Sequence, residues 1–234
     1  MPWTSPPLRP SPRPWALVAA ALLLTGCASG AGPADPTGID QLVVPTPTPD
    51  PGDFAAEPRT DWLPLQPGQK WEYTGEAGQP GERAELRLLR GGREAGVATL
   101  RLSRTGAEVP AAVDALGVDT DGNVWWLARE GDFGPDDPDG VGLLLPAEPR
   151  VGDGWVAATL ADGTVVRSRV ESVDDEVSTA RGTWDDAVRV ETTGAAGNPT
   201  ARTATWWVPG TGPVRVRTAT GEVLDLVDAP RPSQ

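Results

Sequence analysis

The sequence predicts an all-β protein, an antiparallel meander in a strongly curved sheet that forms a half-barrel, a barrel or a sandwich. From Asp61 onward apolar and polar residues alternate with a period of two, which is typical of strands buried on one face. Glycine-containing pairs that favour tight turns separate the alternating runs. Because tight turns join antiparallel neighbours and parallel strands need long crossovers, we expect a meander of about ten strands.

The alternation is clearest in four runs, at residues 85–88, 99–103, 188–191 and 214–217. The turn pairs between such runs are Gly91-Gly92, Asp121-Gly122, Asp162-Gly163 and Thr220-Gly221. Helical patterns are nearly absent, and only residues 111–116 suggest a single turn of helix. The predicted domain spans residues 61–229 and is followed by a short disordered tail, residues 230–234.

Composition narrows the function classes. The 234-residue chain has a formal charge of −13, and such a negative field repels nucleic acid. The single cysteine excludes an internal disulfide, and the lack of histidine removes both the usual acid–base group near neutral pH and the common Cys/His zinc sites. We therefore expect no cofactor, no nucleic-acid partner and no enzymatic activity.

The first 26 residues have the pattern of a secretory signal. A polar, arginine-containing stretch precedes a continuous apolar run at residues 15–24. A run of that length is too short to cross a bilayer, because a membrane-spanning helix needs about 20 apolar residues. No other apolar stretch in the sequence comes near that length. Residues 1–26 are thus predicted to be a cleaved signal peptide.

The residues that follow the apolar run are Leu24, Thr25, Gly26 and Cys27. This tetrapeptide resembles the lipobox of bacterial lipoproteins, in which the cysteine thiol receives a diacylglyceryl group and the cysteine becomes the new amino terminus. The resemblance implies a protein anchored by lipid at Cys27 to the outer face of a cell membrane, since two or more acyl chains hold a protein stably there.

Residues 27–60 predict a disordered tether between the anchor and the domain. Small, polar and proline residues dominate this segment, which therefore lacks the apolar surface needed to offset its ordering entropy. The Pro-Thr repeat at residues 45–49 favours extended polyproline II structure, which would make the tether a semi-stiff spacer.

Tryptophan is unusually abundant, with ten residues in the chain and two adjacent pairs, Trp125-Trp126 and Trp206-Trp207. Neighbouring side chains in a strand point to opposite faces of the sheet, so each pair should place one ring on each face. The ring outside the core either lies under another segment of the chain or forms an apolar patch that faces a ligand. We favour the first arrangement and keep the four tryptophans as candidate ligand-facing residues.

Several segments carry a resemblance beyond the lipobox. Residues 119–133 (DTDGNVWWLAREGDF) lead from an Asp-Gly turn into an aromatic strand, and residues 203–216 (TATWWVPGTGPVRV) contain an aromatic-x-Pro-Gly-x-Gly-x-Val turn. This order resembles a family of uncharacterised exported bacterial proteins, many of them lipoproteins. The resemblance covers about residues 61–228. It implies an all-β domain outside the membrane, and it implies no activity.

Carboxylates offer the remaining routes to chemistry. Asp119 and Asp121 superficially resemble the start of a calcium-binding loop, although the glycine and the final glutamate of such a loop are misplaced, and a hairpin turn accounts for the same residues. A hydrolase would need two acids facing one cleft. The acidic stretches at residues 174–176 and 185–186 have instead the pattern of solvated turns.

Taken together, these features predict a membrane-anchored, extracytoplasmic lipoprotein with a non-enzymatic binding domain for a hydrophobic small molecule. Two alternatives stay open. One is a structural module whose acidic face binds an envelope protein or Ca²⁺, and the other is a carboxylate-dependent hydrolase.

Overall fold

The sheet is described from a computed structural model. The residues that it describes are 43–44, 50–75, 83–106, 111–132, 134, 141–194 and 198–230. Of the two units into which the chain divides, Gly38–Gln234 holds all of these residues.

The described residues confirm the all-β prediction, since their regular structure is one sheet and a single turn of 3-10 helix, η3 (Pro51–Asp53). The strands are β1 (Val43–Val44), β2 (Lys70–Gly75), β3 (Arg83–Glu94), β4 (Val97–Gly106), β5 (Ala112–Val118), β6 (Val124–Arg129), β7 (Gly142–Leu145), β8 (Gly154–Thr159), β9 (Val165–Thr179), β10 (Gly182–Thr193), β11 (Arg202–Val208), β12 (Gly212–Arg217) and β13 (Val223–Asp228).

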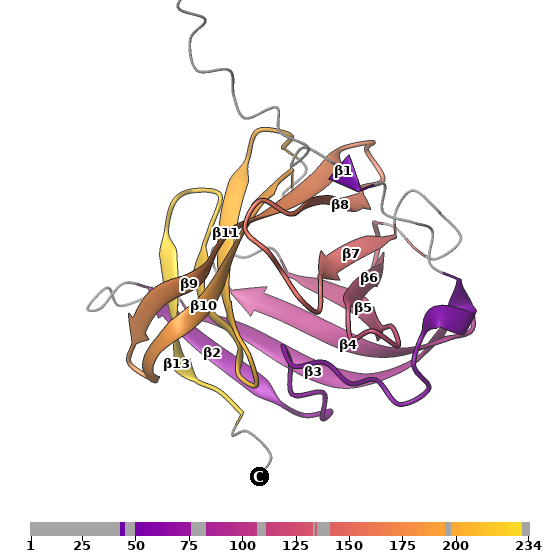
Figure 1. The fold of residues 1–234 in the computed structure, drawn as a ribbon, viewed down its shortest axis with the longest axis horizontal. Helices are drawn as coiled ribbons and strands as arrows, with labels where there is room; N and C mark the ends of the chain where they lie inside the picture. Colours follow the sequence, from indigo (N-terminus) through magenta and orange to yellow (C-terminus); the bar gives the residue numbers. More distant parts are fainter. Residues whose placement is uncertain are drawn as a thin grey trace, which may run out of the picture. The chain divides into compact units, whose positions relative to one another are not determined.

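The predicted meander is confirmed as well. Strands β2 to β7 and β8 to β13 each pair antiparallel in chain order, and β13 pairs with β2 to join the two halves. The twelve strands of this meander, counted within the described ranges, slightly exceed the ten that turn spacing suggested. They curl into a nearly closed barrel, and the short β1 adds a parallel edge to β8 (Figure 1).

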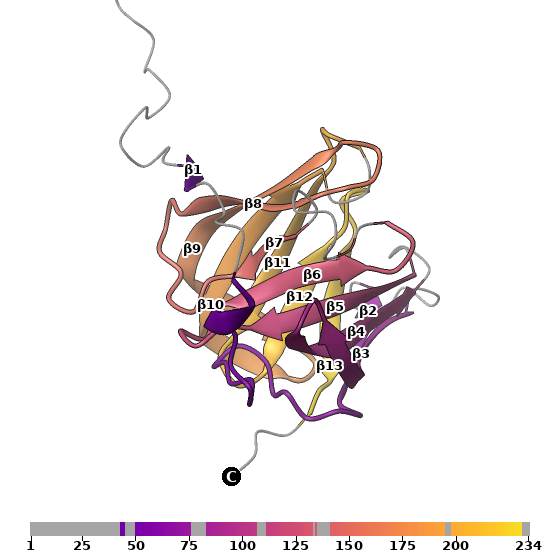
Figure 2. The ribbon, with the colours of Figure 1, turned by 90° about the vertical axis from the view of Figure 1, so that its right-hand side faces the viewer.

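The barrel comes closest to closing where β7 faces β8, the two ends of the meander (Figures 1 and 2). The indole Nε1 of Trp155 on β8 donates a hydrogen bond of 2.6 Å to the carbonyl of Leu143 on β7. A Cβ at Gly142 would lie 2.3 Å from the carbonyl oxygen of Ala157. The seam between β7 and β8 is thus held by a side chain and by a close backbone approach that only glycine permits.

Gly142→Ala is expected to lower the free energy of unfolding by about 1–3 kcal/mol, because the added methyl would force the two backbones apart. The midpoint of urea denaturation measures the loss. Gly154→Ala on β8 is the matched control, since its Cβ would meet nothing closer than 3.8 Å. Equal stability of the two variants would show that the seam is not tightly packed.

Three of the four predicted turns are confirmed, because Asp121-Gly122, Asp162-Gly163 and Thr220-Gly221 each connect two neighbouring strands. Gly122 has a positive φ of 91°, as its place in a tight turn requires. The helical turn suggested at residues 111–116 is wrong. Residues 112–116 belong to β5, whose backbone bonds to both β4 and β6, so pairing in the sheet overrides the local helix propensity of the alanines.

The turn predicted at Gly91-Gly92 is also wrong. Both glycines lie within β3, at a bulge in its pairing with β4. A Cβ at Gly91 would lie 2.0 Å from the carbonyl oxygen of Thr99, so this glycine allows the two strands to approach closely. The chain reverses instead at Ala95 and Gly96, which both have positive φ. Glycine pairs serve bulges as well as turns, and the sequence does not distinguish the two uses.

The packed part of the chain extends further towards the N-terminus than the predicted boundary at Asp61. The backbone of Phe54 forms a bridge with Asp119, and the amide of Ala55 donates to the carbonyl of Val118. The ring of Phe54 packs edge-on against Trp125 at a centroid distance of 6.1 Å. Residues 50–60, assigned to the tether on composition, therefore run along the sheet. The rest of the predicted tether, apart from residues 43–44, lies outside the described residues.

Residues 61–63 cross one end of the barrel. The indole of Trp62 donates to the carbonyl of Pro146, which follows β7, and the carbonyl of Asp61 accepts from the amide of Gly210 in the β11–β12 turn. Trp62 and Leu63 are buried in the main hydrophobic core. This segment therefore packs against the end of the barrel where β7 and β11 finish.

Candidate functional site

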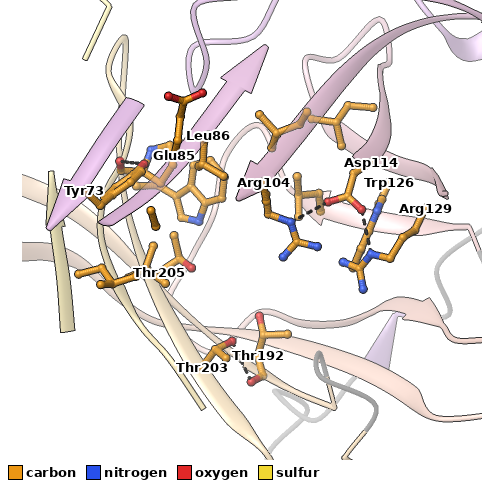
Figure 3. Close-up of a pocket in the computed structure, with 18 residues that line it drawn as sticks. Tyr73, Glu85, Leu86, Arg104, Asp114, Trp126, Arg129, Thr192, Thr203 and Thr205 are labelled. Carbon is orange, nitrogen blue, oxygen red and sulfur yellow. Dashed lines mark hydrogen bonds and ion pairs between the residues drawn. The ribbon is translucent and has the colours of Figure 1, made fainter. Parts of the chain in front are cut away.

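A cavity of about 180 Å³ lies inside the curved sheet and is partly open to solvent (Figure 3). Its lining comes from ten of the strands, β2 to β7 and β10 to β13. The lining residues are Tyr73, Ala84, Glu85, Leu86, Leu102, Arg104, Asp114, Leu116, Trp126, Arg129, Leu144, Thr192, Thr203, Thr205, Trp207, Pro213, Val216 and Leu224. Most of this surface is apolar, and a few charged and hydroxyl groups lie among the apolar residues.

Strand alternation explains which residues face the cavity. Leu102 and Arg104 are two positions apart on β4, and Thr203, Thr205 and Trp207 follow the same period on β11. Several of the polar members lie towards strand ends, since Thr203 is near the beginning of β11 and Arg129 is the last residue of β6. Tyr73 and Thr205 lie in the middle of β2 and β11, so polar groups also occur among the apolar walls.

The predicted division of the tryptophan pairs fits the structure. Trp126 and Trp207 line the cavity, whereas Trp125 contacts Phe54 and Trp206 donates a hydrogen bond of 2.8 Å to Asp175 on the β9–β10 hairpin. All four rings are buried. Segments of the chain itself thus cover the outer rings, and of the four candidate ligand-facing residues Trp126 and Trp207 line this cavity.

A charged cluster forms one wall of the cavity, with one residue from each of three adjacent strands (Figure 3). The Nε of Arg129 donates to one oxygen of Asp114 at 2.9 Å, and the Nε of Arg104 lies 3.2 Å from the other oxygen. The guanidinium of Arg129 also stacks on Trp126, 4.1 Å from the ring centroid, and approaches Asp132 at 3.9 Å. The buried carboxylate of Asp114 therefore forms ion pairs with two guanidinium groups.

The two arginines are not equally engaged. Arg129 contacts two carboxylates and an aromatic ring, and its side chain is 11% exposed. Arg104 pairs with Asp114 alone among the described residues, and through one edge of the guanidinium. Desolvation by burial lowers the pKa of Arg104 from its usual value, although the carboxylate of Asp114 opposes this shift. Arg104 therefore has terminal N–H donors for which no described residue provides an acceptor.

Tyr73 lies on the opposite side of the cavity and is buried, with its hydroxyl donating to the carbonyl of Pro213 at 2.7 Å. Desolvation raises the pKa of this phenol well above its usual value of 10.0. Charging the phenol would place an anion inside the barrel and remove the hydrogen bond. The folded protein therefore keeps Tyr73 neutral at pH values at which an unfolded chain would ionise it.

Stability is accordingly expected to fall above about pH 10, where the unfolded chain loses the tyrosine proton and the folded chain retains it. The contribution of Tyr73 is complete below the unfolded pKa and declines by about 1.4 kcal/mol for each further pH unit, until the folded pKa is reached. Tyr73 is the only tyrosine, so tyrosinate absorbance reports this group alone. We expect the absorbance to rise together with unfolding, and an earlier rise in the folded protein would contradict the assignment. Tyr73→Phe should remove this part of the pH dependence.

The weak calcium candidates occupy a turn. The carboxylate of Asp119 accepts hydrogen bonds from the backbone amides of Asp121 and Asn123, from the side-chain amide of Asn123 and from the indole of Trp125. Both of its oxygens thus face N–H donors, an arrangement that closes the β5–β6 turn. Asp121 is exposed. Among the described residues, no group of three or more acidic, histidine or cysteine side chains is arranged to hold a metal ion.

The acidic stretches weighed for a hydrolase lie on the β9–β10 hairpin, and none of their residues lines the cavity. Asp175 accepts from the indole of Trp206 and lies 3.5 Å from Arg189, so its contacts tie the hairpin to the barrel. Asp185 and Asp186 are exposed. The cavity's own acids are Asp114, paired with two arginines, and Glu85, which pairs with Arg87 at 3.1 Å and lies 3.8 Å from Lys70.

The predicted lipidation site lies outside the described residues, as do all of residues 1–42. Lipidation of Cys27, and the lipobox formed with Leu24, Thr25 and Gly26, therefore remain predictions from the sequence. In the described part of the chain, no helix has the length and apolar character needed to cross a membrane.

The comparisons with known proteins add no assignment. No model of a known protein family matches the chain, and neither the curated proteins nor the solved structures contain a significant match. The candidate site is therefore identified from the structure of this chain alone, without a relative whose site could be compared.

Proposed function

We propose that the protein is a membrane-anchored extracytoplasmic lipoprotein whose barrel binds a hydrophobic small molecule without chemically changing it. One observation carries the binding part of this proposal, namely a partly open cavity of about 180 Å³ with mainly apolar walls. Ligand sites commonly combine such walls with a few convergent polar groups. A dry engineered cavity of roughly 150 Å³ already binds benzene, so a small ligand or one end of a longer one fits here.

The anchoring part rests on the sequence. A signal-like leader followed by a lipobox-like tetrapeptide implies a lipid at Cys27, and the proline-rich segment that follows suits a spacer between bilayer and barrel. The resemblance to exported bacterial lipoproteins points to the same location. We infer that the barrel works close to a source of lipids and other apolar molecules at the cell envelope.

Native mass spectrometry of the protein purified from its host tests the binding. The expected spectrum contains a species heavier than the mature lipidated chain by one small-molecule mass, and denaturation should remove that mass. Thr205→Trp should reduce this species, because the larger ring would fill the cavity at a half-buried position. Val173→Trp is the control, since Val173 is 37% exposed and does not line the cavity. A ligand-free spectrum for the unaltered protein would count heavily against the proposal.

A further inference from the structure

Arg104 lies in the cavity wall, and most of its N–H donors have no acceptor among the described residues. A guanidinium group has five N–H donors. For Arg104, Asp114 is the single partner among the described residues, and it lies beside Nε. The terminal nitrogens of Arg104 point into the open space between the charged wall and the threonines in Figure 3. Its side chain is only 26% exposed, so much of the hydration that an arginine normally has is lost.

The neighbouring groups hold Arg104 in place and leave several of its N–H donors without an acceptor among the described residues. Asp114 is shared with Arg129, which binds it more directly and is also near Asp132. The other acid of the lining, Glu85, has Lys70 and Arg87 as partners. An anion entering the cavity would therefore meet the free edge of a half-buried guanidinium beside an apolar wall.

We propose that the cavity selects an amphiphile with a single carboxylate, and that Arg104 binds the carboxylate while the apolar wall holds the aliphatic chain. A guanidinium fork matches the geometry of a carboxylate and binds it through two parallel hydrogen bonds. The chain would lie against Leu102, Leu116 and Leu224, with Trp126 and Trp207 beside it. The cavity suits roughly six to eight carbons, by comparison with an engineered cavity of about 150 Å³ that takes benzene. This inference rests on the proposed function, because it names the ligand of the same site.

Calorimetric titration with octanoate, 1-octanol and octylamine tests the selectivity, using the chain from Ala28 onward, which contains every residue that the structure describes. The three probes share one aliphatic chain and differ in head-group charge. We expect octanoate to bind roughly 10- to 100-fold more tightly than 1-octanol, as hydrogen bonds to charged groups imply, and octylamine to bind most weakly.

Arg104→Gln should remove most of the preference for octanoate and leave 1-octanol binding almost unchanged. Arg101→Gln is the matched control, because Arg101 lies on the same strand, is exposed and does not line the cavity. Arg104→Gln leaves Asp114 paired with Arg129, so the variant is expected to fold. Arg104→Lys keeps the charge and loses the fork, and it should have an intermediate affinity for octanoate.

The outcomes separate the two proposals. Equal binding of octanoate and 1-octanol, a preference for octylamine, or an unchanged octanoate preference in Arg104→Gln would overturn the carboxylate inference and leave a hydrophobic site standing. Failure of all three probes to bind, together with a ligand-free native mass spectrum, would overturn the proposed function itself.

Discussion

Asp114→Asn is expected to lower the free energy of unfolding by about 3–5 kcal/mol, the usual cost of breaking a buried ion pair on one side only. The carboxylate is 7% exposed and the guanidiniums of Arg104 and Arg129 both face it. Without it, two like charges would lie side by side within the barrel. Urea denaturation measures the effect as a lower midpoint with an unchanged slope.

The same substitution made in an Arg104→Gln variant shows whether repulsion between the two guanidinium groups causes this loss of stability. In Arg104→Gln the same Asp114→Asn change should cost less, because a single guanidinium is then left without its carboxylate. Glu148→Gln serves as the control, since Glu148 and its partner Arg150 are almost fully exposed and lie 3.9 Å apart. A loss below about 1 kcal/mol for Asp114→Asn would mean that water, rather than Asp114, compensates the arginines.

Cys27→Ser is expected to move the protein almost completely from the membrane fraction to the soluble extracytoplasmic fraction. The hydroxyl of serine cannot form the thioether that we propose carries the acyl chains, and the rest of the sequence has no comparable apolar segment. Fractionation followed by mass measurement of the intact protein detects both the lipid and the position of cleavage.

Ser29→Ala, two residues beyond Cys27, is the control and should leave the protein in the membrane fraction. If the Cys27→Ser protein still sedimented wholly with membranes, the lipid anchor would not be the cause of membrane attachment. Recovery of the intact, unprocessed chain from the cytosol of unaltered cells would likewise contradict export.

The sequence predicted the fold class well because strand periodicity and turn chemistry are local signals. The runs at residues 85–88 and 214–217 lie within β3 and β12, and Asp121-Gly122 forms a turn as expected. The same local signals wrongly predicted a turn at Gly91-Gly92, which lies at a bulge within β3, because bulges and turns both favour glycine. It also assigned residues 50–60 to the tether, since the packing of Phe54 on Trp125 depends on a partner about seventy residues away.

The candidate site could be predicted only in part. Tryptophan pairs and strand alternation indicated that one ring of each pair faces inward, and Trp126 and Trp207 do line the cavity. The cluster of Arg104, Asp114 and Arg129 was missed because it forms across three strands, and its members come together only when the strand register is known. One local signal did exist. Asp114 stands in the apolar stretch at residues 111–118, where a buried charge demands a partner.

The most direct test of the central claim is a nuclear magnetic resonance measurement of contacts between octanoate and methyl-labelled leucines. Binding inside the barrel predicts nuclear Overhauser effects from the ligand's methylenes to Leu102, Leu116 and Leu224, which line the cavity. It predicts none to Leu63 and Leu160, which are buried but do not line it. Contacts confined to other leucines, or no contacts at saturating octanoate, would contradict a ligand site within the curved sheet.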